Sequence, residues 1–153
     1  MIYRPYEEAD FAALYAIEEA CFEPLFRFPR RYMRHLLQRA NAAAWIALTG
    51  EGEMAGFAIA GWSSHGDVCL AYIETIEVLA EARGQGAGGE LLRRIEGSAL
   101  RAGAAAIWLH VDAENAAAIQ LYERHGYHPA GREEKFYPQG RAALIYRKEL
   151  QAS

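Results

Sequence analysis

The chain has 153 residues, of which 52% are apolar and 24% charged, and its formal net charge is −4. This length suffices for one domain with a sizeable core, and the apolar fraction excludes a disordered chain. The acidic balance gives no reason to expect a nucleic-acid partner, and no apolar run approaches the length that spans a membrane. We therefore expect a single domain over residues 1–153, with neither a nucleic acid nor a membrane as its partner.

The cysteines and the first residues indicate the cellular compartment. Cys21 and Cys69 have neither metal-ligand spacing nor the density of a disulfide framework. Free thiols are typical of a reducing compartment. The segment from Met1 to Pro5 lacks the pattern of a signal peptide. These features predict a cytoplasmic protein without a metal site, which is either a monomer or a homodimer.

The first half of the chain predicts a strand, two helices and a hairpin. The expected elements are a strand over Met1–Arg4, a helix that opens at Glu7–Asp10 and has Phe11, Leu14, Ile17 and Cys21 near one face, a helix over Arg30–Arg39, and strands over Ala43–Leu48 and Met54–Trp62. Pro24 and Pro29 interrupt the chain between the helices, so Phe22–Pro29 is expected to be irregular. Two turns are expected, at Gly50–Glu53 and at Ser63–Asp67.

The second half predicts alternating strands and helices, followed by a final hairpin. The expected elements are strands over Tyr72–Val78, Ala105–Val111 and Ala142–Glu149, and helices over Gly86–Ala102 and Asn115–His125. Gly103 and Gly126 are expected to end the two helices. An arm through Phe136 and Tyr137, followed by a turn at Gly140, precedes the last strand. The sum is a single α+β domain of about seven strands and four helices.

A glycine-rich loop, Arg83-Gly-Gln-Gly-Ala-Gly-Gly89, leads into the third of these helices. Gly84, Gly86, Gly88 and Gly89 let backbone N–H groups approach a ligand without interference from a Cβ atom. The first four amides of a helix lack intrahelical partners, and the helix dipole is positive there. The loop therefore predicts a phosphate or pyrophosphate site, most simply for a cofactor that contains a nucleotide.

The same loop matches the dinucleotide fingerprint G-x-G-x-x-G over Gly84–Gly89. Asp112 even follows at about the position of an acidic ribose ligand. However, Leu79–Arg83 separates the strand from the glycines, and no further βα repeats complete a doubly wound sheet. A NAD-binding protein is therefore the third choice.

The alternative motif, Arg/Gln-x-x-Gly-x-Gly/Ala, is met by Arg83–Gly88 and resembles the pyrophosphate loop of the GNAT superfamily of acetyl-CoA-dependent N-acetyltransferases. Ile107–Tyr127 agrees, because it resembles the family's strand, Asn-x-x-Ala helix and aromatic-Gly-aromatic turn. The resemblance implies a GNAT fold, which is an α/β/α sandwich-like α+β domain with a mixed, mostly antiparallel seven-stranded sheet and splayed fourth and fifth strands. It also implies acetyl-CoA as the cofactor.

In this family pantetheine lies between the splayed strands and pairs with the backbone of the fourth. The residues that the resemblance assigns to the cofactor are Ile76, Glu77, Val78, Arg83, Gly84, Gln85, Gly86, Ala87, Gly88, Asn115, Ala118 and Tyr122. The amide N–H of Ile76 or of a neighbour would face the thioester oxygen. Asn115 is either a plain helix N-cap or a cap that also contacts the cofactor.

Acetyl transfer to an amine also needs a general acid for the leaving thiolate and a base for the amine. Tyr122 matches the family's tyrosine that points at the sulfur. A phenol with a pKa of about 10 is a suitable donor to a thiolate with a pKa of about 8.5 or above. Alternatively, Tyr122 only packs in the core, because it follows Ile119 by three residues and so shares its face of the helix.

Two types of acetyltransferase suggest different bases. The RimI-like enzymes, which act on ribosomal proteins, resemble the chain within Trp108–Glu123 but have a glutamate where this chain has His110. A eukaryotic N-terminal acetyltransferase type carries Tyr-Ile-x-Thr and Leu-His-Val, as do Tyr72–Thr75 and Leu109–Val111 here. In that type the tyrosine and the histidine relay a proton through water. The resemblance therefore implies that Tyr72 and His110 converge on one water.

Other base candidates stay open. Glu74 is expected on the strand face of Tyr72, and Glu77 on the opposite face. Either carboxylate is an alternative base or a solvated or salt-bridged group, and Glu74 ranks before Glu77. Histidine exchanges a proton near neutral pH, which suits a base, but His110 could equally be a packed histidine of the sheet.

The acceptor site is expected between two loops rich in aromatic residues. Phe22, Leu25 and Phe26 offer an apolar wall, and Phe136-Tyr137 resembles a turn that clamps a peptide backbone; the alternative is a local packing cluster. The favoured acceptor is the N-terminal α-amine of a peptide or protein, because its pKa of about 7.8 lies well below the value of about 10.4 for lysine. The alternatives are a small-molecule amine, such as a polyamine, an amino acid or an aminoglycoside, and a non-catalytic sensor that binds acyl-CoA.

Overall fold

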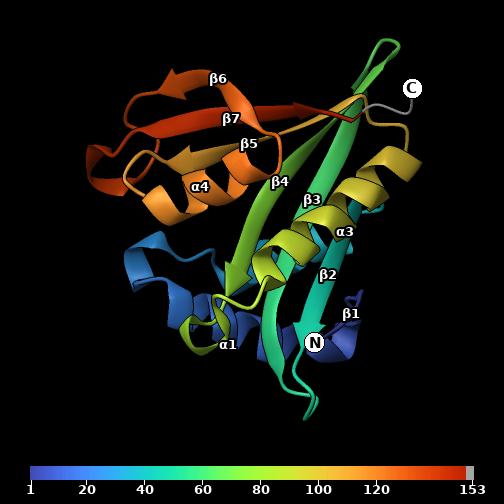
Figure 1. The fold of residues 1–153 in the computed structure, drawn as a ribbon, viewed down its shortest axis with the longest axis vertical. Coiled ribbons are helices and arrows are strands. Elements are labelled where there is room, and N and C mark those ends of the chain that lie inside the picture. Colours follow the sequence, from blue (N-terminus) through green and yellow to red (C-terminus); the bar gives the residue numbers. More distant parts are fainter. Residues whose placement is uncertain (151–153) are drawn as a thin grey trace.

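A seven-stranded sheet forms the centre of the protein (Figure 1), in a computed structural model that describes residues 1–150. Its strands are β1 (Ile2–Pro5), β2 (Ala42–Leu48), β3 (Met54–His65), β4 (Val68–Val78), β5 (Ala106–Asp112), β6 (His128–Glu133) and β7 (Ala143–Glu149). They lie in the order β1-β2-β3-β4-β5-β7-β6. Every neighbouring pair is antiparallel except β4 and β5, which are parallel. The predicted mixed and mostly antiparallel sheet is confirmed.

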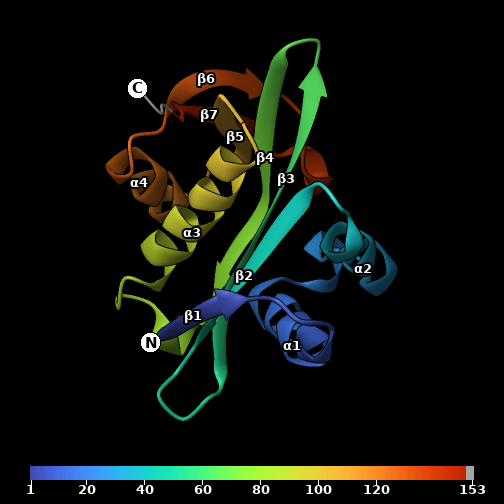
Figure 2. The ribbon, with the colours of Figure 1, turned by 90° about the vertical axis from the view of Figure 1, so that its right-hand side faces the viewer.

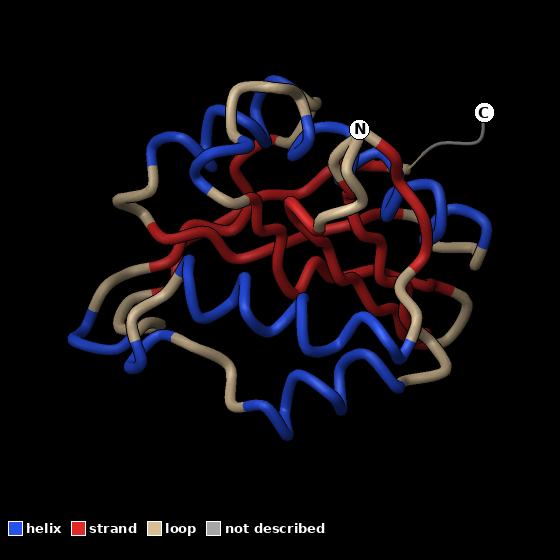
Figure 3. The backbone as a smooth tube through the Cα atoms, turned by 90° about the horizontal axis from the view of Figure 1, so that it is seen from below, coloured by secondary structure: helices blue, strands red, loops and turns tan. Residues whose placement is uncertain are grey.

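Four α-helices cover the two faces of the sheet: α1 (Phe11–Cys21), α2 (Arg30–Gln38), α3 (Ala87–Arg101) and α4 (Ala116–Arg124). Helices α1 and α2 pack on one face and α3 and α4 on the other (Figures 2 and 3), so the predicted three layers are present. Each face has its own apolar core, one including Phe57 and Ile59 and the other including Leu91 and Ile95. No helix within residues 1–150 is long and apolar enough to cross a membrane.

The helix ends follow from local sequence. The side chain of Asn115 caps α4, because its Oδ1 accepts a hydrogen bond from the Ala118 N–H at 3.1 Å. Gly103 and Gly126, which follow α3 and α4, have φ angles of +95° and +89°. Glycine adopts these left-handed values without a Cβ penalty, so both helices stop where the sequence predicted.

The turn expected at Ser63–Asp67 is wrong. Strand β3 continues to His65, which pairs with Val68, and only Gly66 and Asp67 form the turn. Gly66 has a φ of +64°, and a glycine with positive φ permits a two-residue hairpin that keeps both strands paired. Ser63 and Ser64 suggested a turn because they are polar. They lie on the exposed end of the β3–β4 hairpin, where a strand tolerates polar side chains.

Strands β4 and β5 separate part of the way along the sheet, as the family resemblance implied. They pair only from Leu70 with Ala106 to Tyr72 with Trp108, although both strands continue. The β3–β4 register also shifts just beyond this point, which leaves Glu74 as an extra residue in a bulge. A bulge bends its strand and ends regular pairing, so it opens the gap in which the candidate site lies.

Candidate active site

A cavity of about 820 Å³, which we call the main cavity, occupies the gap between β4 and β5. Its walls come from the end of α1, the first loop (residues 22–29), the late loop (residues 134–142) and one side of α4. The main cavity therefore joins the region expected to hold the cofactor to the loops expected to hold the acceptor.

The predicted pair of Tyr72 and His110 is in direct contact. The Tyr72 hydroxyl lies 2.7 Å from Nδ1 of His110, and Nε2 of the same ring lies 3.1 Å from Oε1 of Glu133 on β6. Burial raises the pKa of Tyr72, and the charge of Glu74 raises it further, so this hydroxyl keeps its proton at neutral pH. The structure therefore brings together the two side chains that the sequence placed in one pair, and the Tyr72 hydroxyl has a proton to donate to Nδ1 of His110.

Aromatic rings hold His110 in place from two sides. Phe136 stacks on the imidazole with ring centres 4.0 Å apart and an interplanar angle of 13°. Trp108 also contacts the imidazole, with ring centres 5.3 Å apart and an interplanar angle of 60°. Tyr137 in turn meets Phe136 edge-on. The late loop therefore contacts the candidate base directly as well as lining the acceptor end of the main cavity.

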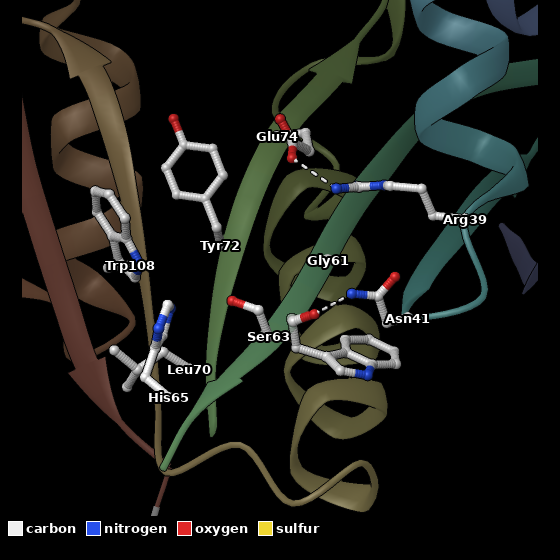
Figure 4. Close-up of a pocket in the computed structure, with 10 residues that line it drawn as sticks. Arg39, Asn41, Gly61, Ser63, His65, Leu70, Tyr72, Glu74 and Trp108 are labelled. Atoms are coloured by element: carbon white, nitrogen blue, oxygen red, sulfur yellow. Dashed lines mark hydrogen bonds and ion pairs between the residues drawn. The ribbon is translucent and has the colours of Figure 1, made fainter. Parts of the chain in front are cut away.

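Glu74 lines the main cavity and also a second cavity of about 270 Å³ beside it, shown in Figure 4. Arg39, which follows α2, reaches over Gly61 to Glu74, and its Nη1 lies 3.3 Å from Oε2 of the carboxylate. Burial raises the pKa of Glu74, and the guanidinium opposes this shift. Tyr72 lines only the second cavity and His110 only the main one, so their hydrogen bond links the two.

Tyr122 projects from α4 into the main cavity and is almost completely buried. Its ring packs edge-on against Tyr127, with centres 5.6 Å apart. Burial raises the pKa of Tyr122. The phenol therefore stays protonated at neutral pH and is available as a proton donor toward the cavity.

The glycine-rich loop contains two kinds of glycine. Gly84 and Gly86 have φ angles of +82° and +81°, and a Cβ atom on either would meet only open space. Their requirement is the left-handed backbone, which turns the chain into α3. At Gly89, in contrast, a Cβ atom would lie 2.7 Å from Nε2 of His125, so this glycine makes room for α4. The Cβ position of Gly89 thus faces α4, whereas the approach of its backbone N–H to a ligand stays a prediction.

The residues assigned to the cofactor fall into three groups. Ile76, Asn115, Ala118 and Tyr122 line the main cavity. Arg83, Gly84, Gln85, Gly86, Ala87 and Gly88 lie in the loop and at the start of α3, where Arg83 turns its Nε back onto the Val78 carbonyl at 3.0 Å. Val78 ends β4 outside the cavity lining, and Glu77 is buried under α1.

The orientation of Glu77 corrects the expected alternation along β4. Because Glu74 is the bulged residue, Thr75 and Glu77 pair with Ile59 and Phe57, on the face that α1 covers, which is also the face of Tyr72. The Glu77 carboxyl lies beside that of Glu18 from α1, and the hydroxyl of Thr75 donates to it at 2.8 Å. Burial and the neighbouring carboxyl raise the pKa of Glu77 to about 10. Glu77 is accordingly ill placed as a base for the amine.

All five predicted acceptor residues line the main cavity: Phe22, Leu25, Phe26, Phe136 and Tyr137. Arg141 ties their two loops to the sheet, because it forms an ion pair with Asp112 and lies 5.3 Å from the centre of the Phe26 ring. Glu18 accepts a hydrogen bond from the Phe28 N–H at 2.9 Å and so fixes the first loop to α1.

Sequence reasoning missed Glu18, Arg39, Glu133 and Arg141. Only Glu18 left a signal, because it falls four residues after Leu14 on the apolar face of α1, where an acidic residue is unexpected. The other three are ordinary charged residues that gain their partners from distant strands. The sheet also rules out the dinucleotide alternative, since β4 and β5 are the only parallel pair among the strands of residues 1–150.

Comparison with known proteins agrees with this geometry. Residues 11–127 match the model of the Acetyltransferase (GNAT) family. The chain is 35% identical over 121 residues to the alanine N-acetyltransferase of ribosomal protein bS18 from Escherichia coli K12, across 68% of this chain and 78% of that protein. It is 36% identical over 104 residues to streptothricin acetyltransferase from Streptomyces lavendulae, across 68% of this chain and 53% of that protein. The matching region thus spans about half the length of the second relative.

A solved structure confirms the fold. The crystal structure of the ribosomal-protein-S18-alanine N-acetyltransferase from Escherichia coli superposes with a TM-score of 0.85 at 28% identity, over 99% of this chain and 95% of that one. The family match extends over β4, β5, the glycine-rich loop and α4, whereas the late loop lies beyond the matched residues and is covered by the structural superposition. The chain belongs to the acetyltransferase (GNAT) family and is an acetyltransferase that uses acetyl-CoA.

Proposed function

We propose that the chain acetylates the N-terminal α-amine of a peptide or protein, by direct transfer. The observation that carries this proposal is the 2.7 Å hydrogen bond between Tyr72 and His110, at the junction of the two cavities. The likeness to an enzyme that acts on an alanine of ribosomal protein bS18 supports the same class of acceptor. A cytoplasmic location fits such an acceptor.

The residues present fit acetyl-CoA, which when bound supplies the acetyl group as a thioester. Beyond Tyr72 the edge of β4 has no strand partner on the β5 side, so its backbone at Ile76 is available to an extended ligand. The amides at the start of α3 and the left-handed turns at Gly84 and Gly86 suit a pyrophosphate. Asn115 and Ala118 would form the α4 wall.

Deprotonation of the amine is assigned to Tyr72 and His110 together. The ammonium group of the acceptor passes a proton through a water, as the resemblance implied, to the Tyr72 oxygen while the Tyr72 proton moves to Nδ1 of His110. The hydroxyl is thereby regenerated, the amine becomes neutral and the imidazole becomes the cation. An α-amine suits this weak base, because at a pKa of about 7.8 roughly a tenth of it is already neutral near pH 7. Glu74 is placed to accept an N–H of the amine and orient its lone pair.

Tyr122 is proposed as the general acid. It lines the same cavity as His110, and its raised pKa keeps the phenol protonated at neutral pH, so a proton is in place beside the sulfur when the thiolate departs. The proposed acid and base thus come from opposite walls of the gap, α4 and β5. A sensor that binds acyl-CoA without turnover would have no need of both.

A small-molecule amine is the second candidate acceptor. Carboxylates of Glu18, Glu23, Glu74, Asp112 and Glu114 line the main cavity, against the single guanidinium of Arg141. Such a lining favours a cationic acceptor, and streptothricin acetyltransferase is among the relatives. However, Asp112 and Glu74 are each paired with an arginine, so the cavity has less uncompensated negative charge than its number of carboxylates suggests.

The test is the release of free thiol from acetyl-CoA with peptides of varied first residue, spermidine, free amino acids and streptothricin as acceptors. Turnover with one class of peptide, abolished when its N-terminus is blocked, would support the proposal. Turnover with small amines alone would refute the peptide acceptor. Lysine-containing peptides with blocked N-termini are the matched control, because they offer only the less acidic side-chain amine.

A further inference from the structure

The carboxylate of Glu133 lies behind the candidate base. It stands at the end of β6, and its Oε1 lies 3.1 Å from Nε2 of His110. The side chain of His110 is 9% exposed and that of Glu133 is 53% exposed. Glu133 is therefore an exposed partner of a mostly buried imidazole.

The hydrogen bonds fix the arrangement of protons on the ring. A carboxylate oxygen only accepts, so Nε2 of His110 must donate its N–H to Glu133. The neutral ring then has an unprotonated Nδ1, which accepts the Tyr72 hydroxyl at 2.7 Å. A ring protonated on Nδ1 would present an N–H to Tyr72, and a flipped ring would present a C–H, so neither could take the Tyr72 proton.

We propose that Glu133 is a positioning residue for the reaction, which holds His110 in the orientation that accepts a proton from Tyr72. This inference rests on the proposed function of the Tyr72–His110 pair. When His110 takes up the proton at Nδ1, both ring nitrogens carry hydrogen, and Glu133 faces the new imidazolium with its negative charge. Phe136, stacked on the ring, restricts rotation but offers no acceptor, so the directional contact at Nε2 comes from Glu133.

Because Glu133 is exposed, we expect its hydrogen-bond acceptor to matter more for the reaction than its negative charge. Water and salt screen the charge of an exposed carboxylate, whereas the direction of the hydrogen bond is retained. Glu133→Gln keeps a carbonyl oxygen for the Nε2–H, so kcat should stay within about threefold of the parent value. Glu133→Ala removes the acceptor, and kcat should fall about 10-fold to 100-fold, as for other carboxylates that orient a histidine. The KM for acetyl-CoA should be unchanged in both variants.

A double variant separates positioning from a general structural role. In a His110→Ala background, Glu133→Ala should cause no further loss, because the group it positions is gone. Glu134→Gln is the matched control: this neighbour pairs with Arg132 and not with His110. Spectra of ¹⁵N-labelled histidine rings, with His110 identified by its loss in His110→Ala, should show hydrogen on Nε2 and none on Nδ1 in the neutral form.

The outcomes distinguish the two proposals. If His110→Ala leaves turnover unchanged with every active acceptor, the proposed base is wrong. If His110→Ala lowers turnover but Glu133→Ala does not, only the role of Glu133 is refuted. Hydrogen on Nδ1 in the neutral ring, or additive losses in the double variant, would also overturn the positioning role.

Discussion

The buried carboxyl groups of Glu18 and Glu77 lie side by side between α1 and β4, and within residues 1–150 neither is paired with a cation. Within residues 1–150, Oε1 of each carboxyl group has no hydrogen-bond partner. Burial and the neighbouring Glu18 carboxyl raise the pKa of Glu77, because two ionised carboxylates this close would repel each other, so the protonated form of Glu77 is favoured in the folded protein. Glu18 belongs to α1, which anchors the first loop, and Glu77 belongs to β4, which borders the main cavity. The protonation of Glu77 therefore affects how α1 packs on β4.

Stability should depend on this proton. The pKa of Glu77 rises from 4.5 to about 10 on folding, so the folded state holds a proton that the unfolded chain releases between these values. The free energy of unfolding should therefore fall as pH rises through this window, by up to about 1.4 kcal/mol per pH unit. Glu77→Gln cannot ionise and should reduce this slope. Urea unfolding at pH 6 and pH 9 measures it.

The control for that experiment is Glu81→Gln, which removes an exposed carboxylate just after β4. It should leave the slope as in the parent chain. Equal slopes in the parent and Glu77→Gln would show that folding does not raise the pKa of Glu77.

Removing the hydroxyl of Tyr122 should affect chemistry and not binding. Tyr122→Phe keeps the ring packed against Tyr127, and kcat should fall about 10²-fold to 10⁴-fold, the range for loss of a general acid. The Kd for acetyl-CoA, from calorimetry, should change less than threefold. Tyr127→Phe is the matched control, because its hydroxyl donates to Glu96 at 2.8 Å. A similar fall in kcat for both variants would refute the role of Tyr122.

Alanine at Gly86 should weaken donor binding. Gly86 needs a left-handed backbone, which costs a residue with Cβ about 1–2 kcal/mol, and the loop should relieve the strain by changing shape. The Kd for acetyl-CoA should rise about tenfold, with little change in the melting temperature. An unchanged Kd would show that the loop does not depend on this conformation to bind the donor.

Alanine at Gly89 should instead lower stability. The added Cβ would displace the ring of His125, at a cost of about 1 kcal/mol, because this ring can still rotate. Adding His125→Ala should recover most of the loss, as measured by thermal unfolding. Failure of this rescue would mean that the glycine serves the loop and not the packing of α3 on α4.

Arg39 and Glu74 should be coupled. Their side chains are only 23% and 14% exposed, so Arg39→Met leaves a poorly solvated carboxylate without its cation and should cost about 1–3 kcal/mol. The double variant Arg39→Met/Glu74→Gln should cost less than the sum of the two single losses, by about 1 kcal/mol. Chemical unfolding of all four proteins measures this difference. If the two single losses add up to the loss of the double variant, the ion pair between Arg39 and Glu74 does not contribute to stability.

The sequence by itself determined the order of the elements, the family and many of the residues that line the main cavity. Periodicity, caps and glycines are local signals, so α3, α4 and the cap at Asn115 are where they were expected. The acceptor aromatics and Tyr122 line one cavity, and β4 and β5 separate, as the motifs implied.

Only the tertiary structure decided which charged groups meet. The bulge at Glu74 reverses the alternation of side chains along β4. Glu77 therefore lies on the face of Tyr72, beside Glu18, and not on the opposite face as the sequence predicted. The contacts of Arg39 and Glu133 join residues 35 and 23 positions apart across different elements, at distances set by strand register and helix packing. A sequence specifies these contacts only through the whole fold, because no local pattern fixes where a strand bulges or where a long side chain ends.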